Sequence, residues 1–169
     1  MTPPLRLTIG DSPLGRLLVA TSPAGLCAVL PGDADDCLRE ALRRRLPGHP
    51  WLPVPPSEEP AFAAVLALIA TPAAGWAGPP LVLTGTPFQR RVWEALRAIP
   101  CGRIVTYGQL AATLGAPRAT RAVAAAVGAN ALAVVVPCHR VGFADGGLGG
   151  FRWGLARKRA LRAREAALV

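Results

Sequence analysis

Residues 131–140 read ALAVVVPCHR, in which six apolar residues run directly into Pro137, Cys138, His139 and Arg140. The apolar run is typical of a buried strand, and the proline ends it. Because the thiolate is the reactive form of cysteine and a neighbouring base or positive charge favours it, the stretch predicts an activated nucleophile. A buried structural cysteine beside a surface histidine is the alternative, and this stretch alone does not decide between the two.

The thiol and the imidazole belong to adjacent residues. Adjacent side chains on a regular strand point to opposite faces, so Cys138 and His139 would not touch there. Pro137 removes a donor and bends the backbone. We therefore expect a proton relay through one water rather than a direct contact.

The composition indicates a protein with a sizeable core. The 169 residues allow one large domain or two small ones. Hydrophobic residues make up 51% of the chain, but many are alanine, so the mean hydropathy of +0.35 does not indicate a membrane protein. Charges close the long uncharged run at residues 122–138, and the N-terminus lacks the pattern of a signal peptide. We expect a soluble, cytoplasmic protein that makes no membrane contact.

The net charge of +9 is concentrated in one half of the chain. Residues 1–84 carry six basic residues against seven acidic ones, whereas residues 85–169 carry thirteen against three. A basic half favours an anionic partner, and nucleic acid is the leading candidate. Because eighteen of the nineteen basic residues are arginine, an arginine-rich solvated surface is the alternative.

The first half predicts a small sheet with helices. Turn signals separate three short runs of strand character, and leucines four apart indicate a helix. We expect strands at 5–10, 16–20, 26–30 and 81–83, helices at 35–46 and 61–70, and a loop at 47–60. The domain boundary is placed near Gly85, which gives domains at 1–84 and 85–169.

The second half predicts mostly helices. Thr86 and Thr106 are candidate N-caps, and Pro87 suits the first position of a helix. Two helices separated by a turn at Gly115 in a basic region are typical of a helix-turn-helix. The helices expected here cover residues 87–99, 106–114, 117–129 and 155–168.

The second helix of this pair carries little side-chain bulk. Alanine occupies positions 119, 122, 124, 125 and 126. A helix that reads the major groove is expected to carry Asn, Gln, Arg or Lys, so we infer approach to the minor groove with little sequence readout. The alternative is that the alanines pack inward.

Several motifs of the second half point to one family. They are TGTPFQ at 84–89, IPCG at 99–102, YGQLA at 107–111, RAV at 121–123, Asn130, PCHRV at 137–141, GFRWG at 150–154 and Glu165. In this combination the chain closely resembles bacterial O6-alkylguanine-DNA alkyltransferases, also called methylated-DNA–protein-cysteine methyltransferases. The first half resembles the family's ribonuclease-H-like domain more weakly.

The resemblance implies an α+β protein with a small N-terminal sheet and a mostly helical C-terminal domain. It implies a single-turnover enzyme that moves the alkyl group of O6-methylguanine, and of O4-methylthymine, from duplex DNA to the protein. It further implies a monomer that needs no cofactor.

The resemblance also implies roles for individual residues. Cys138 accepts the alkyl group, His139 takes the thiol proton through a water, and Glu165 orients His139. Asn130 braces the turn that presents the cysteine. Tyr107 donates a proton to the leaving guanine and crowds the adjacent phosphate.

Further residues are implied in contacts with DNA and with the flipped base. Arg121 enters the duplex where the target base has left. The other DNA contacts are implied at Arg118, Ala119 and Ala122, and the guanine pocket at Val127, Val141, Gly149, Gly150, Phe151 and Arg152.

The chain departs from the family at a few positions. Phe151 stands where many members have tyrosine, and Gly142 stands where a second aliphatic residue is common. Some members bind zinc in the N-terminal domain, but Cys27, Cys37 and His49 lack compact ligand spacing, so we expect no metal.

Three other functions are weighed against alkyl transfer. A damage-sensing relative without productive transfer would lack the acceptor, which Cys138 supplies here. A helix-turn-helix transcription factor would carry base-reading side chains on its second helix. A Cys-His hydrolase would turn over many times and would not need a basic half.

Overall fold

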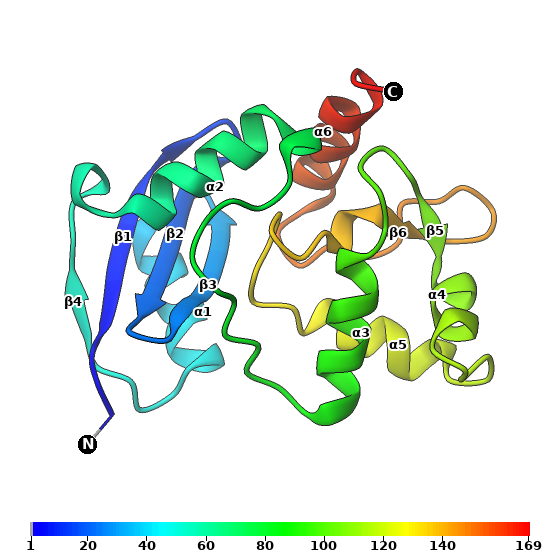
Figure 1. Cartoon of the computed structure of the whole chain (residues 1–169), viewed down its shortest axis with the longest axis horizontal. Helices are drawn as coiled ribbons and strands as arrows, with labels where there is room; N and C mark the ends of the chain where they lie inside the picture. Colours follow the sequence, from blue (N-terminus) through cyan, green and yellow to red (C-terminus); the bar gives the residue numbers. More distant parts are fainter. Residues whose placement is uncertain (1) are drawn as a thin grey trace. The chain divides into compact units, whose positions relative to one another are not determined.

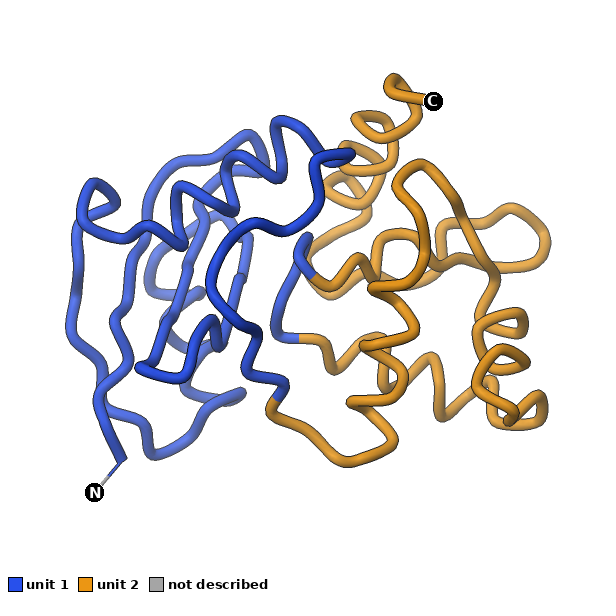
Figure 2. The backbone as a smooth tube through the Cα atoms, in the orientation of Figure 1, with its two compact units in different colours: residues 1–83, 131–135 blue, residues 84–130, 136–169 orange. Residues whose placement is uncertain are grey.

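The computed structural model describes residues 2–169, and the chain forms two units (Figure 2). Unit 1 comprises residues up to Leu83 together with Ala131–Val135, and unit 2 comprises Thr84–Asn130 and Val136–Val169. The chain therefore passes between the units three times. The boundary expected near Gly85 accounts for the first passage only, because residues 131–135 group with the first part of the chain.

Unit 1 is built on a four-stranded sheet in the order β3-β2-β1-β4 (Figure 1). The antiparallel strands follow one another through the tight turns that the sequence predicts, and the short fourth strand pairs parallel to the first. The strands are β1 (Leu5–Ser12), β2 (Gly15–Ser22), β3 (Gly25–Gly32) and β4 (Trp51–Pro53). The helical segments of this unit are α1 (Asp35–Arg45), α2 (Pro60–Ala70), and the 3-10 turns η1 (Pro56–Glu58) and η2 (Pro72–Ala74).

One helix covers each face of this sheet. Gly10 and Gly32 lie on opposite faces, because their partners are adjacent residues of β2. A Cβ at Gly10 would lie 2.7 Å from Phe62 of α2, and one at Gly32 would lie 2.7 Å from Leu38 of α1. The two glycines therefore let the helices approach the sheet closely.

Three expectations for unit 1 are wrong. Residues 81–83 were expected to be a strand, but only Leu81 makes an isolated bridge, with Leu26. Residues 47–60 were expected to be a loop, but they hold β4 and η1, because the open edge of β1 accepts a short parallel partner. Residues 131–136 were expected to be a strand, but they make only an isolated bridge between Leu132 and Val29. Val134 has a φ of 71°, which a β-branched residue rarely adopts and which interrupts an extended path.

Unit 2 is mostly helical, and its first two helices begin where the sequence predicts. Thr86 forms a capping box with Gln89, and Thr106 forms one with Gln109. The elements are α3 (Pro87–Arg97), β5 (Val105–Thr106), α4 (Tyr107–Thr113), α5 (Thr120–Gly128), η3 (Cys138–Arg140), β6 (Val141–Gly142) and α6 (Leu155–Ala166). Buried Trp93 on α3 donates from its indole nitrogen to the Ala126 carbonyl at 2.8 Å, which ties α3 to α5.

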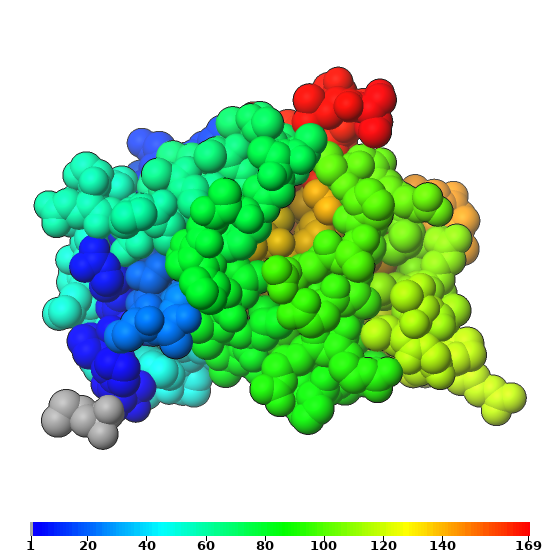
Figure 3. All heavy atoms as spheres, viewed as in Figure 1, coloured from blue at the N-terminus to red at the C-terminus, as the bar shows by residue number. Residues whose placement is uncertain are grey.

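Helix α5 begins later than expected. It was expected to start at Pro117 or Arg118, but Ala119 is its N-cap, with φ and ψ of −95° and 26°. Arg118 therefore lies in the turn that precedes the helix. Figure 3 shows this turn, residues 114–119 (yellow-green), standing out from the surface of unit 2.

Candidate active site

Cys138 lies at the start of η3 in a tight turn. Pro137 has φ and ψ of −80° and 64°, and the Cys138 amide donates to the Val136 carbonyl at 2.8 Å, which makes an inverse γ-turn. The side-chain amide of Asn130 donates to the same carbonyl at 3.0 Å and lies 3.3 Å from Cys138 Sγ. Asn130 therefore connects the end of the α5 segment to the turn that presents the thiol.

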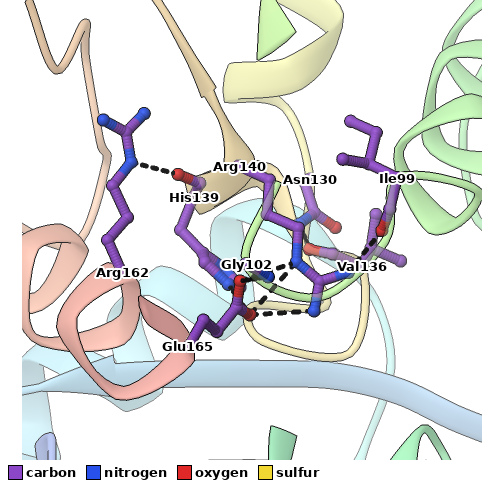
Figure 4. A network of polar contacts seen from close by, with 8 residues as sticks. All are labelled: Ile99, Gly102, Asn130, Val136, His139, Arg140, Arg162 and Glu165. Carbon is purple, nitrogen blue, oxygen red and sulfur yellow. Dashed lines mark hydrogen bonds and ion pairs between the residues drawn. The ribbon is translucent and has the colours of Figure 1, made fainter. Parts of the chain in front are cut away.

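His139 and Glu165 form a buried pair beside this turn (Figure 4). His139 Nε2 lies 2.7 Å from Glu165 Oε1, and both side chains are less than 5% exposed. The other ring nitrogen of His139, Nδ1, is buried and has no hydrogen-bond partner among residues 2–169. One nitrogen is thus held by the carboxylate, and the second keeps a free hydrogen-bonding position.

Glu165 is further held by two other groups. The Arg140 guanidinium donates to both carboxylate oxygens at 2.8–3.1 Å and to the Ile99 carbonyl at 2.6 Å. The Gly102 amide donates to Oε2 at 3.0 Å. The carboxylate therefore has its orientation fixed by α6, by η3 and by the turn that follows α3.

The pKa values in this cluster define its protonation. Burial lowers the pKa of His139, and this effect outweighs the hydrogen bond with Glu165. Burial raises the pKa of Glu165, but the hydrogen bonds from His139 and Arg140 outweigh it and lower the pKa to about 2. At neutral pH the imidazole is neutral and the carboxylate is ionised, so Nε2 donates to Glu165 and Nδ1 is an acceptor.

A pocket of about 340 Å³ opens beside Cys138, within the range of small-molecule sites. Tyr107 lines it, and burial together with the charge of Cys138 raises the pKa of that phenol, so the phenol stays protonated at neutral pH. The complete lining is Tyr107, Ala124, Val127, Gly128, Cys138, Gly150, Phe151, Arg152 and Trp153.

Two residues expected in the pocket have other positions. Val141 is fully buried in β6 and does not line the pocket. Gly149 has a φ of 71°, and a Cβ there would lie 2.7 Å from the Tyr107 hydroxyl oxygen, so it packs against Tyr107 and does not line the pocket. Only glycine, which has no Cβ, allows the backbone to approach Tyr107 this closely.

The residues expected to contact DNA lie on or just before α5. Arg118, Arg121 and Ala122 are exposed, and Ala119 is half-buried. Val123, Ala126 and Val127 are buried, so one face of α5 packs inward and the face with Arg121 and Ala122 is free. The alanines are therefore divided between the interior and the surface.

Sequence reasoning missed several contributors to the site. Lys158 and Arg162 were counted only among the basic residues of the second half, but Lys158 is fully buried and Arg162 donates to the His139 and Val141 carbonyls. Their spacing, with Glu165, of four and three residues is the signal of one inward helix face. Gly102 acts through its backbone, and no side-chain pattern reveals such a contact.

Two features are absent from residues 2–169. None of their helices is both long and apolar enough to span a bilayer. No cluster of three or more His, Cys, Asp or Glu side chains in this range could hold a metal ion.

Comparison with known proteins finds a matching family model and similar curated chains. Residues 87–167 match the family model described as the 6-O-methylguanine DNA methyltransferase DNA-binding domain. The regulatory protein ada of Salmonella typhimurium is 49% identical over 162 residues, which are 96% of this chain and 46% of that protein. A methylated-DNA–protein-cysteine methyltransferase from the same organism is 59% identical over 85 residues, half of each chain. The chain thus spans about half the length of the curated relatives it matches.

Solved structures resemble the whole chain. Mycobacterium tuberculosis O6-methylguanine methyltransferase superposes with a TM-score of 0.76 at 35% identity, covering 98% of this chain and 94% of the other. The structure of Mycobacterium tuberculosis OGT in complex with DNA gives a TM-score of 0.75 at 36% identity, covering 96% and 93%. These likenesses include the first part of the chain, up to Leu83, which the family model does not reach.

Proposed function

Because the chain belongs to the O6-methylguanine-DNA methyltransferase family, we propose that it repairs duplex DNA by moving the alkyl group of O6-methylguanine irreversibly to its own Cys138. The observation that carries the proposal is the buried pair of Glu165 and His139. The second ring nitrogen of His139, Nδ1, is left as an acceptor, and the preceding residue in the chain, Cys138, lines the pocket. O4-methylthymine is a second substrate under the same chemistry.

The first step activates the thiol. A free cysteine has a pKa of about 8.5, so a base is needed at neutral pH. His139 Nδ1 accepts the Cys138 proton through one water, and the Glu165 carboxylate stabilises the imidazolium that forms. Asn130 holds the turn so that the sulfur faces the pocket.

The second step is displacement at the alkyl carbon. The Cys138 sulfur forms a bond to that carbon while the bond to guanine O6 breaks, and the electron pair remains with guanine. Tyr107, whose raised pKa keeps it protonated, supplies a proton to the leaving base. The product is a thioether, and no group in the described site is placed to cleave it, so each molecule repairs one lesion.

The target base must leave the stack to reach the pocket. Helices α4 and α5 act as a helix-turn-helix that approaches the minor groove through the exposed face of α5, with contacts at Arg118, Ala119, Arg121 and Ala122. Arg121 fills the gap in the duplex, and Tyr107 crowds the adjacent phosphate. Val127, Gly150, Phe151 and Arg152 surround the flipped guanine.

The remaining assignments concern the whole molecule. The strand order β3-β2-β1-β4, with β4 parallel to β1, supports a ribonuclease-H-like N-terminal domain. We further propose that the protein acts in the cytoplasm, as its composition suggests, and as a monomer without a cofactor, as the family resemblance implies.

A transfer experiment tests the acceptor. Duplex DNA with radiolabelled O6-methylguanine should label the protein to about one methyl group per molecule, and Cys138→Ser should take up no label while still binding the duplex. Cys101→Ser is the matched control and should be labelled like the wild type. Label on Cys27, Cys37 or Cys101, or many lesions repaired per molecule, would contradict the proposal. Binding without any transfer by the wild type would favour a damage sensor.

A further inference from the structure

Lys158 on α6 is a lysine with no solvent exposure. No carboxylate of residues 2–169 pairs with it, although buried charges are usually paired. Its ammonium group instead donates to two backbone carbonyls, those of Leu148 and Gly150, the latter at 3.1 Å. The charge therefore has a specific contact with one segment of the chain.

That segment, residues 147–154, forms one side of the pocket. Leu148 and Gly150 flank Gly149, which passes so close to the Tyr107 ring that a Cβ would lie 2.7 Å from the hydroxyl oxygen. The residues that follow, Gly150 to Trp153, line the pocket. Lys158 Nζ also lies 5.8 Å from the centre of the Phe151 ring, which adds a cation–π contact. One ammonium group thus binds the residues on both sides of Gly149, where the segment lies closest to Tyr107.

We propose that Lys158 is a positioning residue whose protonated side chain fixes segment 147–154 against Tyr107 and so forms the alkylguanine pocket. An ammonium group gives three charge-assisted hydrogen bonds, whereas a neutral amine gives weaker ones. The pocket is fully formed only while Lys158 carries its proton. The kinetic part of this inference rests on the proposed function.

The surroundings of Lys158 place its titration within reach of experiment. Burial lowers its pKa, Arg162 one turn further along α6 lowers it again, and Cys138 on η3 raises it, with a result of about 8. Lys158 therefore loses its proton between pH 7 and pH 9.5. Arg162 is held by the His139 and Val141 carbonyls and does not reach the same segment by any described hydrogen bond.

The test compares Lys158→Met with Arg159→Met, which removes an exposed charge from the next position of α6. At pH 7 and saturating methylated duplex, Lys158→Met should transfer the methyl group about 10-fold more slowly than the wild type, and Arg159→Met should match the wild type. Because Lys158 is buried, Lys158→Met should bind unmodified duplex within about twofold of the wild type.

The pH profile separates positioning from a merely structural role. The advantage of the wild type over Lys158→Met should fall from about 10-fold at pH 7 to within about twofold at pH 9.5, because the wild-type lysine is then neutral. The transfer rate of Lys158→Arg, which keeps its charge, should rise relative to that of the wild type above pH 8. A ratio that stays constant with pH, or equal rates at pH 7, overturns the inference. If Lys158→Met does not fold, the Lys158→Arg and wild-type profiles decide, and parallel profiles overturn it.

Hydrogen exchange provides a readout that does not depend on transfer. At pH 7 the amides of residues 147–154 should exchange about 10-fold faster in Lys158→Met than in the wild type, and the amides of α3 should be unchanged. If exchange differs between the two proteins in this way but the wild type takes up no methyl label, the proposed function fails and the inference stands. Equal protection of the segment in both proteins overturns the inference.

Discussion

Glu165 shows how a single residue can combine stability and reactivity. It accepts hydrogen bonds from His139, from Arg140 and from the Gly102 amide, so each of its two carboxylate oxygens has more than one donor. Breaking a buried, hydrogen-bonded pair from one side leaves the other charge uncompensated. The carboxylate that we propose orients His139 for proton transfer therefore also stabilises the fold.

Its lowered pKa has a consequence for acid stability. The carboxyl has a pKa of about 2 in the folded protein and 4.5 ordinarily, so its stabilising contribution is present above pH 4.5 and is lost as the pH falls towards 2. The contribution of Glu165 to the free energy of unfolding, measured with urea, should decrease by about 2 kcal/mol between pH 7 and pH 3. The difference between wild type and Glu165→Gln should shrink over the same interval. A difference that is constant with pH would mean that folding does not shift the pKa of this carboxyl.

Glu165→Gln should also slow methyl transfer by about 10-fold or more, since the imidazolium loses its counter-charge. Affinity for unmodified duplex is the control and should change little. Equal losses in transfer and in binding would assign Glu165 to folding alone.

At the scale of elements, helix α6 differs most from its sequence pattern. Its residues Lys158, Arg162 and Glu165 face the interior, whereas Arg159 and Arg164 are exposed. Composition places charged residues outside because they are seldom fully buried without partners. The partners here are carbonyls and a histidine from other segments, and no local pattern shows them.

Other elements were predictable for physical reasons. Helices α3 and α4 begin at Thr86 and Thr106 because a capping box is a local signal with its own hydrogen bonds. Strand β4 was not predicted, since three residues in a proline-rich segment pair with β1 only in the folded chain. Among the candidate site residues, the pairing of His139 with Glu165 came from family resemblance, because 26 residues separate them.

The small-residue face of α5 gives a prediction for DNA binding. Ala122 is exposed, and leucine has nearly the helix propensity of alanine, so Ala122→Leu should leave thermal stability within about 0.5 kcal/mol. The added bulk should keep the helix out of a narrow groove and weaken duplex binding about 10-fold. Ala163→Leu on the exposed side of α6 is the matched control, and fluorescence anisotropy measures both. Unchanged affinity for Ala122→Leu would exclude this face as the contact surface.

At the scale of the whole molecule, charge is divided unequally. Unit 2 holds thirteen basic residues against three acidic ones. Three of the basic residues, Lys158, Arg162 and Arg140, are occupied by contacts within the unit. The charge available to a phosphate backbone is therefore smaller than composition alone indicates.

Salt dependence measures that available charge. The logarithm of the duplex affinity should fall linearly with the logarithm of salt concentration, by about 0.9 for each phosphate neutralised. Arg118→Ala, in the exposed turn before α5, should reduce the slope by about 0.9. Lys158→Met should leave it unchanged, because a buried ammonium releases no counterion. A slope reduced equally by both variants would show that Lys158 reaches the DNA.

The three passages of the chain between its units bear on how the protein can be divided. Residues 131–135 belong with the sheet, where Leu132 bridges Val29, while their neighbours on both sides belong to unit 2. A chimera that exchanges the first 83 residues for those of a relative would leave this short insert facing a foreign partner strand, and the insert ends three residues before Cys138. Recombination between relatives therefore requires two matched exchanges, residues 1–83 and 131–135, for the reactive turn to keep its native anchorage.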